Sequence, residues 1–197
     1  MPNLVLKTIE KRRSVRTFID REIPPDDLLQ VLQAANQAPS AHNRQSWRFV
    51  VVSGARKQEL AALVSRRAGG FARSASALLR MAARSIASAP LVIGVVNTGE
   101  LMQHGTDLMS LDGDAADFFR TMEIQSSAAA VENLLVAAAS LGISSVWLGV
   151  LYLIKNEVLE FLEEPGGEFM AVVPVGYSDK EQRTPAKKLL EARVKFL

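Results

Sequence analysis

Apolar residues recur along this chain in two patterns, one typical of amphipathic helices and one typical of buried strands. Stretches rich in β-branched and aromatic residues predict four strands, at residues 47–54, 90–97, 144–151 and 168–178. Helical spacing, with Pro and Asp at the starts and Gly or Pro at the ends, predicts helices at residues 3–13, 24–39, 55–67, 71–89, 115–141 and 154–162.

Two of these stretches stand out. The helix predicted at residues 115–141 is the longest, and its Ala-rich centre is nearly free of charge, so we expect it to be buried on most of its circumference. Gly142 follows it where a left-handed C-cap is favoured. Residues 99–118 are predicted as a loop, whereas residues 71–89 form either a helix or a mobile lid.

Strands interleaved with helices predict an α+β fold in three layers, a central mixed sheet of four to five strands flanked by helices. With no internal repeat and no interior linker, residues 1–197 form one predicted domain. The end of the chain is polar at first and then apolar. Such a tail either packs on its own domain or docks on a partner subunit, and its apolar residues are Leu189, Leu190, Val194 and Phe196.

Composition excludes several classes of protein. The chain has no Cys and two His, which rules out thiolate chemistry and argues against a metal site. The N-terminus does not resemble a signal peptide, and no apolar run reaches the roughly 20 residues that span a bilayer, so we expect a cytoplasmic protein without a membrane partner. Seven cations face one acid between residues 53 and 96, but aromatic residues are not interleaved, so no nucleic-acid partner is expected.

The common catalytic motifs are missing from the sequence. It has no Walker phosphate loop, no G-x-G-x-x-G after a strand, no HExxH and no G-x-S-x-G. No protein nucleophile is evident, and no catalytic residue is predicted. A bound cofactor is therefore the natural source of chemistry.

The segment "KRRSVRTF" places four cations and two hydroxyls within residues 11–18. Such a cluster is either a solvated face or an anion site, because phosphates prefer forked guanidinium donors and hydroxyls. Two further stretches carry candidate chemistry: "PSAHNRQSWRFVVV", rich in amides and hydroxyls, and "LGISSVWLGVL", where a Gly-flanked strand end admits a flat ligand.

In this order and spacing, the three stretches resemble the FMN-dependent nitroreductase family. "RRSVRTF" is similar to the family's opening motif, "PSAHNRQSWRF" to its strand entry, and "GISSVWLG" to the strand that follows its long dimer-forming helix. "VVPVGY" and the tail "PAKKLLEARVKF" resemble the family's final strand and C-terminal motif. The resemblance implies the nitroreductase-like fold, with the C-terminal arm exchanged in a homodimer.

The resemblance also implies ligands for FMN at the subunit interface. Arg12 and Ser14 would bind the phosphate and Arg16 would lie near the ribityl chain and pyrimidine edge, while Arg13 belongs to the same cluster but is also readable as a surface charge. Lys187 and Lys188 would complete the phosphate site. The remaining cofactor-binding candidates are Pro39, Ser40, Ala41 and Asn43, which would reach across the interface, and the backbone of Leu148 and Gly149.

The implied function is electron transfer from NAD(P)H to a nitroaromatic, a quinone or a similar small acceptor by a ping-pong mechanism. A flavin storage or sensor protein is one alternative. A specialised member of the family is another, such as a dehalogenase, a flavin-cleaving enzyme or an azoline oxidase. A flavin-free anion-binding module would also account for the basic cluster.

Overall fold

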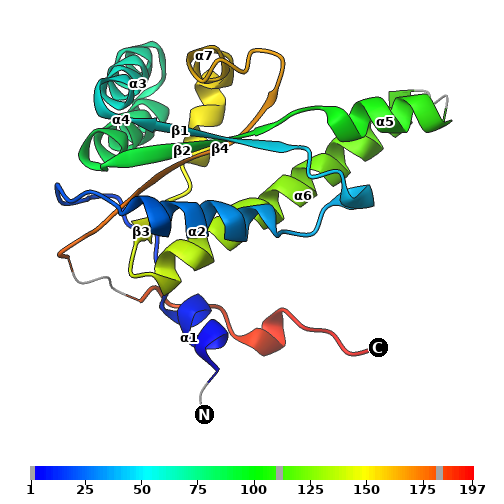
Figure 1. Ribbon diagram of the computed structural model, residues 1–197, viewed down its shortest axis with the longest axis horizontal. Helices are drawn as coiled ribbons and strands as arrows, with labels where there is room; N and C mark the ends of the chain where they lie inside the picture. The colour runs from blue at the N-terminus through cyan, green and yellow to red at the C-terminus, as the bar shows by residue number, and fades with distance from the viewer. Residues whose placement is uncertain (1–2, 110–112, 181–183) are drawn as a thin grey trace.

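A four-stranded sheet divides the protein into layers (Figure 1). The computed structural model describes residues 3–109, 113–180 and 184–197. The strand order is β1-β2-β4-β3, formed by β1 (Trp47–Ser53), β2 (Leu91–Asn97), β4 (Glu168–Gly176) and β3 (Ser144–Ser145). Helices α3 (Gly54–Arg67), α4 (Arg73–Ser88) and α7 (Lys155–Phe161) lie on one side of the sheet, and α2 (Pro25–Asn36) and α6 (Gly113–Ser140) lie on the other. The α+β fold is as predicted.

All neighbouring strands pair antiparallel. The prediction of a mixed sheet is therefore wrong. In the sequence, α3 and α4 lie between β1 and β2, and they pack on each other as an antiparallel pair. The chain runs back along α3 and forward again along α4, so β2 begins beside the end of β1. Strand β2 must then run opposite to β1. The only parallel pairing among the described residues is the single bridge between Ser14 and Ser145.

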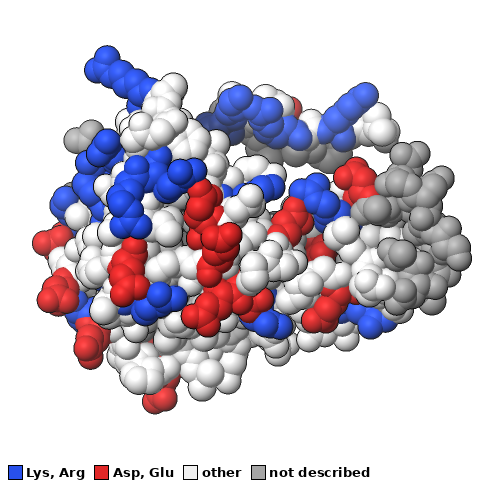
Figure 2. All heavy atoms as spheres, turned by 90° about the horizontal axis from the view of Figure 1, so that it is seen from above, with Lys and Arg blue, Asp and Glu red and all other residues white. Residues whose placement is uncertain are grey.

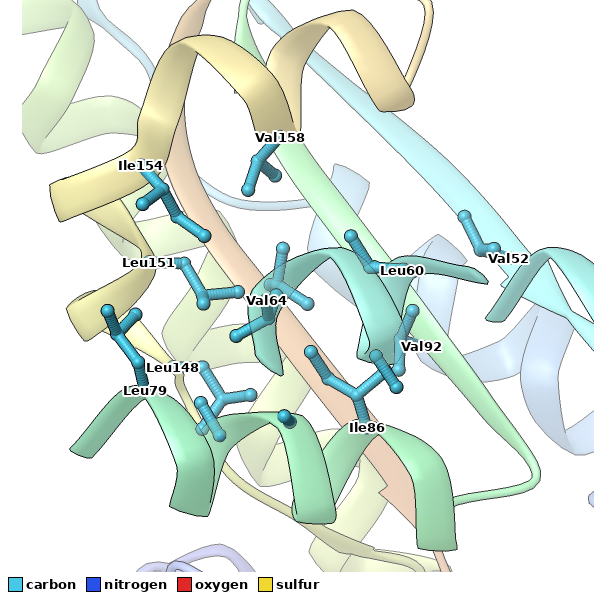
Figure 3. Close-up of a cluster of buried hydrophobic side chains, with 14 of the residues drawn as sticks. Val52, Leu60, Val64, Leu79, Ile86, Val92, Leu148, Leu151, Ile154 and Val158 are labelled. Atoms are coloured by element: carbon cyan, nitrogen blue, oxygen red, sulfur yellow. The ribbon is translucent and has the colours of Figure 1, made fainter. Parts of the chain in front are cut away.

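The core has two halves because both faces of the sheet are covered. Along β2, Val92 and Val96 join the cluster under α3, α4 and α7, whereas Leu91, Ile93 and Val95 join the cluster against α2 and α6. This alternation explains why the strand reads as a continuous apolar run. Figure 3 shows the first cluster, in which Leu60, Val64, Leu79 and Ile86 of α3 and α4 meet Val52, Val92, Leu148, Leu151, Ile154 and Val158.

Two local predictions are wrong. The stretch predicted as a loop at residues 99–118 contains the helix α5 (Glu100–Met109) and the start of α6. Gly105 makes this helix hard to predict from the sequence, because glycine lowers helix propensity. The glycine is needed there because a Cβ would lie 2.3 Å from the Phe119 ring. The third predicted strand is regular only at Ser144–Ser145, and from Gly149 the chain turns into the 3₁₀ helix η3 (Gly149–Ile154).

Other predictions are confirmed. The stretch at residues 71–89 forms the packed helix α4, with Leu79, Ala82 and Ile86 fully buried. Gly142 adopts the left-handed conformation after α6, with φ of 73°. Within the described ranges, none of the helices combines the length and apolarity that crossing a bilayer requires.

The two ends of the chain lie outside the layers (Figure 1). Helix α1 (Leu4–Lys11) is capped by Asn3, whose side chain accepts from the Val5 and Leu6 amides, yet it buries no residue. Residues 184–197, with the short η4 (Leu190–Ala192), are exposed throughout. Large apolar side chains are therefore exposed at both ends: Leu4, Val5, Leu6 and Ile9, and Leu189, Leu190, Val194 and Phe196.

Candidate functional site

The segment Arg12–Arg16 runs beside the short strand β3. The Val15 amide donates to the Ser145 carbonyl at 2.9 Å, and Ser14 bridges to Ser145. Val15 is buried, which turns Ser14 and Arg16 outward, and both of these residues are exposed. The predicted phosphate and ribityl ligands thus project from an edge that is fixed by the sheet.

The end of β3 lies next to this segment. Leu148 is buried, and its amide donates to the Val172 carbonyl of β4 at 3.0 Å. Gly149 is exposed, and a Cβ there would meet only the Trp147 indole at 3.8–3.9 Å. The packing of this chain does not require glycine at 149, so an open backbone face is available to a flat ligand.

The two remaining arginines of the cluster are already engaged. The Arg12 Nε lies 3.7 Å from Glu132 Oε1, with a quarter of its side chain exposed. Arg13 donates through Nη1 to the Glu10 and Arg12 carbonyls at 2.6 and 2.7 Å, and through Nη2 to the Thr184 hydroxyl at 2.7 Å. Arg13 therefore fixes the start of the C-terminal tail beside the cluster, which the sequence did not reveal.

A cavity of about 470 Å³ opens at this place, between α1, the end of α6 and the start of β3. Its lining includes four cations, Lys7, Lys11, Arg12 and Arg13, and no carboxylate. A cavity with this charge favours an anion. Lys187 and Lys188 do not line it, but they follow Thr184 by three and four residues, which keeps their Cα atoms within about 10–15 Å of the Thr184 Cα, and Thr184 accepts a hydrogen bond from Arg13.

The turn around η1 (Ala41–Asn43) is built differently. His42, Asn43 and Gln45 all have positive φ, at 52°, 54° and 49°, a conformation that is costly for residues other than glycine. Hydrogen bonds within the turn hold it: the Gln45 amide donates to Ser40 Oγ at 3.0 Å, and Gln45 Nε2 donates to Asn43 O and Oδ1 at 2.8 and 3.0 Å.

These contacts also orient the Asn43 side chain. Gln45 donates to Asn43 Oδ1, and no hydrogen bond among the described residues engages the Nδ2 donor of Asn43. Ser40 and Ala41 are half-buried, whereas Pro39 and Asn43 are exposed. The four predicted residues of this turn therefore form one small surface with an amide donor at its tip.

Helices α5 and α6 support the turn. Ser126 Oγ accepts from the Ala41 amide at 3.0 Å, and the Arg44 guanidinium lies 2.7 Å from the His104 ring. The Leu101 amide donates to Glu123 Oε1 at 3.3 Å. Sequence reasoning missed Ser126, His104 and Glu123; the only available signal was a pair of serines within the Ala-rich helix.

The two halves of the predicted site are far apart within one chain. Ser126 of α6 holds the η1 turn, whereas Ser140 of α6 lines the basic cavity beside Arg12. Fourteen residues of helix at 1.5 Å each separate these points by roughly 20 Å. Figure 1 shows the same separation, with the turn near α5 and α1 near the opposite end of α6.

Positive charge extends from the first half over a neighbouring surface. The Ser85 hydroxyl of α4 donates to the Arg16 carbonyl at 2.9 Å, which joins α4 to the segment. Lys and Arg side chains gather over α3 and α4 in the view from above (Figure 2). Arg56 and Arg67 pair with carboxylates, whereas no ion pair among the described residues engages Arg66, Arg73, Arg80 or Arg84.

Known proteins resemble this chain in sequence and in fold. A protein of Archaeoglobus fulgidus, provisionally named NADH dehydrogenase/NAD(P)H nitroreductase, is 34% identical over 182 residues, which cover 90% of this chain and 87% of that protein. A nitroreductase with bound FMN from Desulfitobacterium hafniense shares the fold, with a TM-score of 0.76, 23% identity and full coverage of both chains.

A second solved structure shares the fold as well. It is the NADPH:FMN oxidoreductase from Vibrio harveyi complexed with NAD⁺, with a TM-score of 0.78 and 20% identity over 98% of this chain and 77% of that one. The family model described as the nitroreductase family matches residues 9–177, which include both halves of the candidate site. The chain belongs to the nitroreductase family.

Proposed function

We propose that this protein is an FMN-dependent oxidoreductase that takes electrons from NADH or NADPH and passes them to a small acceptor such as a nitroaromatic or a quinone. One observation carries the proposal: exposed Ser14 and Arg16 lie on the same sheet edge as the open Gly149 backbone, beside a cavity lined by cations. When bound, FMN supplies a two-electron carrier that is reduced by a nicotinamide and reoxidised by a second substrate in the same place.

The residues present fit this cofactor. A phosphomonoester carries about −1.5 to −2 charge and needs several donors, which Arg12, Ser14 and the tail lysines Lys187 and Lys188 supply. Arg16 places a guanidinium where negative charge on a reduced ring would be stabilised. Arg13 contributes by holding the tail through Thr184. The backbone of Leu148 and Gly149 would border the ring, since Gly149 is exposed and has no side chain.

A homodimer completes the site. Within one chain the η1 turn and the basic cavity contact α6 at points roughly 20 Å apart, and the family resemblance implies that this turn reaches the flavin of the partner subunit. Pro39, Ser40, Ala41 and Asn43 would therefore come from the partner subunit, with Asn43 donating its Nδ2–H to a ring carbonyl. Exposed apolar residues on α1 and the C-terminal arm supply the surface that such a dimer would bury.

The basic surface of α3 and α4 would attract the substrates. Anionic nicotinamide dinucleotides approach a site whose neighbouring surface carries unpaired arginines, and such a field raises the rate of association. The rate constant for reduction by NAD(P)H should then fall as ionic strength rises.

The test is an anaerobic absorbance spectrum of the protein reconstituted with FMN, recorded before and after NADPH and NADH are added. Flavin bands that bleach, and return when a quinone or nitroaromatic is added, are the expected result. Bands that persist with both nicotinamides would instead favour a storage or sensor protein. Failure to retain any FMN would overturn the proposal and leave a flavin-free anion site.

A further inference from the structure

Buried side-chain oxygens without a hydrogen-bond partner gather at one place, remote from the basic cavity. In the described part of the chain they are Ser46 Oγ, Asn97 Oδ1, Thr98 Oγ1, Glu123 Oε2 and Ser127 Oγ. Ser46, Asn97, Glu123 and Ser127 are at most 1% exposed. Buried polar atoms are nearly always paired in native proteins, so five unpaired oxygens in one region require an explanation.

Printed contacts join these residues into one cluster. The Thr98 amide donates to the Ser46 carbonyl at 3.1 Å, and Asn97 Nδ2 donates to Glu168 Oε2 at 3.4 Å. The Ser46 hydroxyl lies near the Glu123 carboxyl and favours its charged form, although the pair does not reach hydrogen-bonding geometry. Ser127 follows Glu123 by one turn of α6.

The cluster borders a cavity of about 510 Å³. Glu123 and Glu168 line this cavity, which lies between α5, α6, α7 and the loop that leads into β4. Its other lining residues include Gly99, Met102, Arg120, Lys155 and Phe169. The cavity therefore gives access to the Glu123 carboxyl, whereas Ser46, Asn97, Thr98 and Ser127 are not among its lining residues.

No positive charge of the described residues neutralises Glu123. Arg120 donates through Nε to Glu168 Oε1 at 2.8 Å, and its Nη2 pairs with the same oxygen. Lys155 Nζ lies 3.2 Å from the Tyr152 hydroxyl and 4.5 Å from its ring. Burial raises the pKa of Glu123; the Ser46 hydroxyl and the Leu101 and Gly99 amides act to lower it, the like charge of Glu168 adds to the rise, and the net shift is upward. A buried carboxylate in this position needs a cation or a proton.

We propose that Glu123 and the oxygens around it bind a monovalent metal cation, Na⁺ or K⁺, at the inner end of this cavity. Every unpaired atom of the cluster is an oxygen, the ligand type that hard cations prefer. The cluster holds one unpaired carboxylate oxygen together with three hydroxyls and an amide carbonyl, a set that matches a single positive charge.

The site goes beyond the proposed redox function and does not depend on it. Its effect would fall on the η1 turn, because Ser46 directly follows Gln45 and contacts the Glu123 region. An ion held by Ser46, Thr98 and Glu123 would join β1, the end of β2 and α6 behind that turn.

Thermal unfolding of the purified, FMN-loaded protein tests the proposal. Circular dichroism melts are recorded at mildly alkaline pH in NaCl, KCl and choline chloride of equal ionic strength. At a cation concentration tenfold above its Kd, the midpoint should rise by about 3–5 °C in the sodium or potassium salt relative to choline. Equal midpoints in all three salts would overturn the proposal and leave a proton as the neutralising partner.

Two variants and a direct measurement sharpen the result. Glu123→Gln should melt at the same temperature in the three salts, whereas Glu160→Gln, which removes an exposed carboxylate of α7, should keep the difference. Loss of the difference in Glu160→Gln would contradict the assignment. If Glu123→Gln does not fold, ²³Na relaxation of the wild-type protein decides. The signal should broaden beyond that of free Na⁺, and an unbroadened signal refutes a sodium site. Binding of K⁺ is then tested by competition against thallium(I).

Discussion

The two segments that carry the candidate flavin ligands differ in how much of their own structure they supply. Ser14 and Arg16 are exposed, and their backbone is held by the pairing with Ser145 and by the hydrogen bond from Ser85 to the Arg16 carbonyl. The η1 turn has three left-handed residues, internal hydrogen bonds, and contacts to α5 and α6. The Arg12–Arg16 segment presents charged side chains on a sheet edge. The η1 turn has a strained backbone conformation that contacts with the rest of the fold must stabilise.

This difference teaches which kind of ligand each segment serves. A phosphate is recognised by charge from several directions, so flexible guanidinium groups on a fixed edge are sufficient. The edge of a ring requires one donor at one position, and such precision comes from a turn whose conformation is fully determined by its contacts. Substitutions in the first segment should thus affect binding alone, whereas substitutions behind the turn should affect binding and stability together.

Arg12→Gln should have the largest effect on flavin binding. Loss of a charge-assisted contact to the phosphate should raise the Kd for FMN about 10- to 100-fold, with little change in the unfolding midpoint because Arg12 makes only a long ion pair with Glu132. Titration of flavin-free protein with FMN measures the effect. Arg73→Gln, which removes an exposed charge of α4, is the control, and an equal loss there would show that only net charge matters.

Gly149→Ala tests whether the strand end faces the ring. The chain itself accommodates the methyl group, which would lie 3.8 Å from the Trp147 indole, so the melting temperature should stay the same. FMN affinity should fall by about tenfold, since one methyl group would separate the ring from the backbone. Gly69→Ala, at a position with no atom within 4 Å, is the matched control. Unchanged affinity in Gly149→Ala would place the flavin elsewhere.

Ser126→Ala removes one support of the η1 turn without substituting any of the proposed ligands. The Ala41 amide would lose its acceptor, at a cost of about 1 kcal/mol in the free energy of unfolding. FMN affinity should fall by a few fold as the turn loosens. Ser140→Ala, on the same helix beside the other half of the site, should leave the turn intact. Chemical denaturation together with FMN titration separates the two effects, and a loss of stability without any loss of affinity would uncouple the turn from the cofactor.

Sequence reasoning named candidate ligand segments, which stay predictions, but it did not name the residues that support them. The Arg12–Arg16 cluster and the strand end at Gly149 are each a continuous stretch of sequence. Each can therefore be identified from a short motif. Ser126, His104 and Glu123 act on a turn 60–85 residues away. A serine on a helix has no local pattern that indicates its partner, and only tertiary packing brings these groups together.

The same physical reason explains the error in the fold. Gly105 and nearby polar residues resemble a loop because glycine lowers helix propensity. The structure forms a helix there. Glycine occupies position 105 because close packing against Phe119 leaves no room for a Cβ. The strand predicted at residues 144–151 had the right composition, but Gly149 ends the extended backbone to start η3. Local propensity was overruled by packing in the first case and was read too far along the chain in the second.

Lys57 provides a contrast with the exposed arginines, and its substitution should leave FMN affinity unchanged. Its Nζ is buried and donates to the Ala87 and Ala89 carbonyls at the end of α4. Burial lowers the pKa of Lys57, with Asp20 opposing the shift. Between that lowered pKa and the ordinary value of 10.5, the unfolded state binds more protons than the folded state, so this group makes stability rise with pH.

Lys57→Met should therefore remove an alkaline slope of at most about 1.4 kcal/mol per pH unit from the free energy of unfolding. The difference between wild type and variant, measured by urea denaturation from neutral to alkaline pH, cancels the titration of the other lysines and tyrosines. A difference that grows with pH while the Kd for FMN stays constant would assign Lys57 to the fold. A weaker affinity in Lys57→Met would instead extend the anion site beyond the Arg12–Arg16 segment, and the contrast between structural and ligand-binding cations would fail.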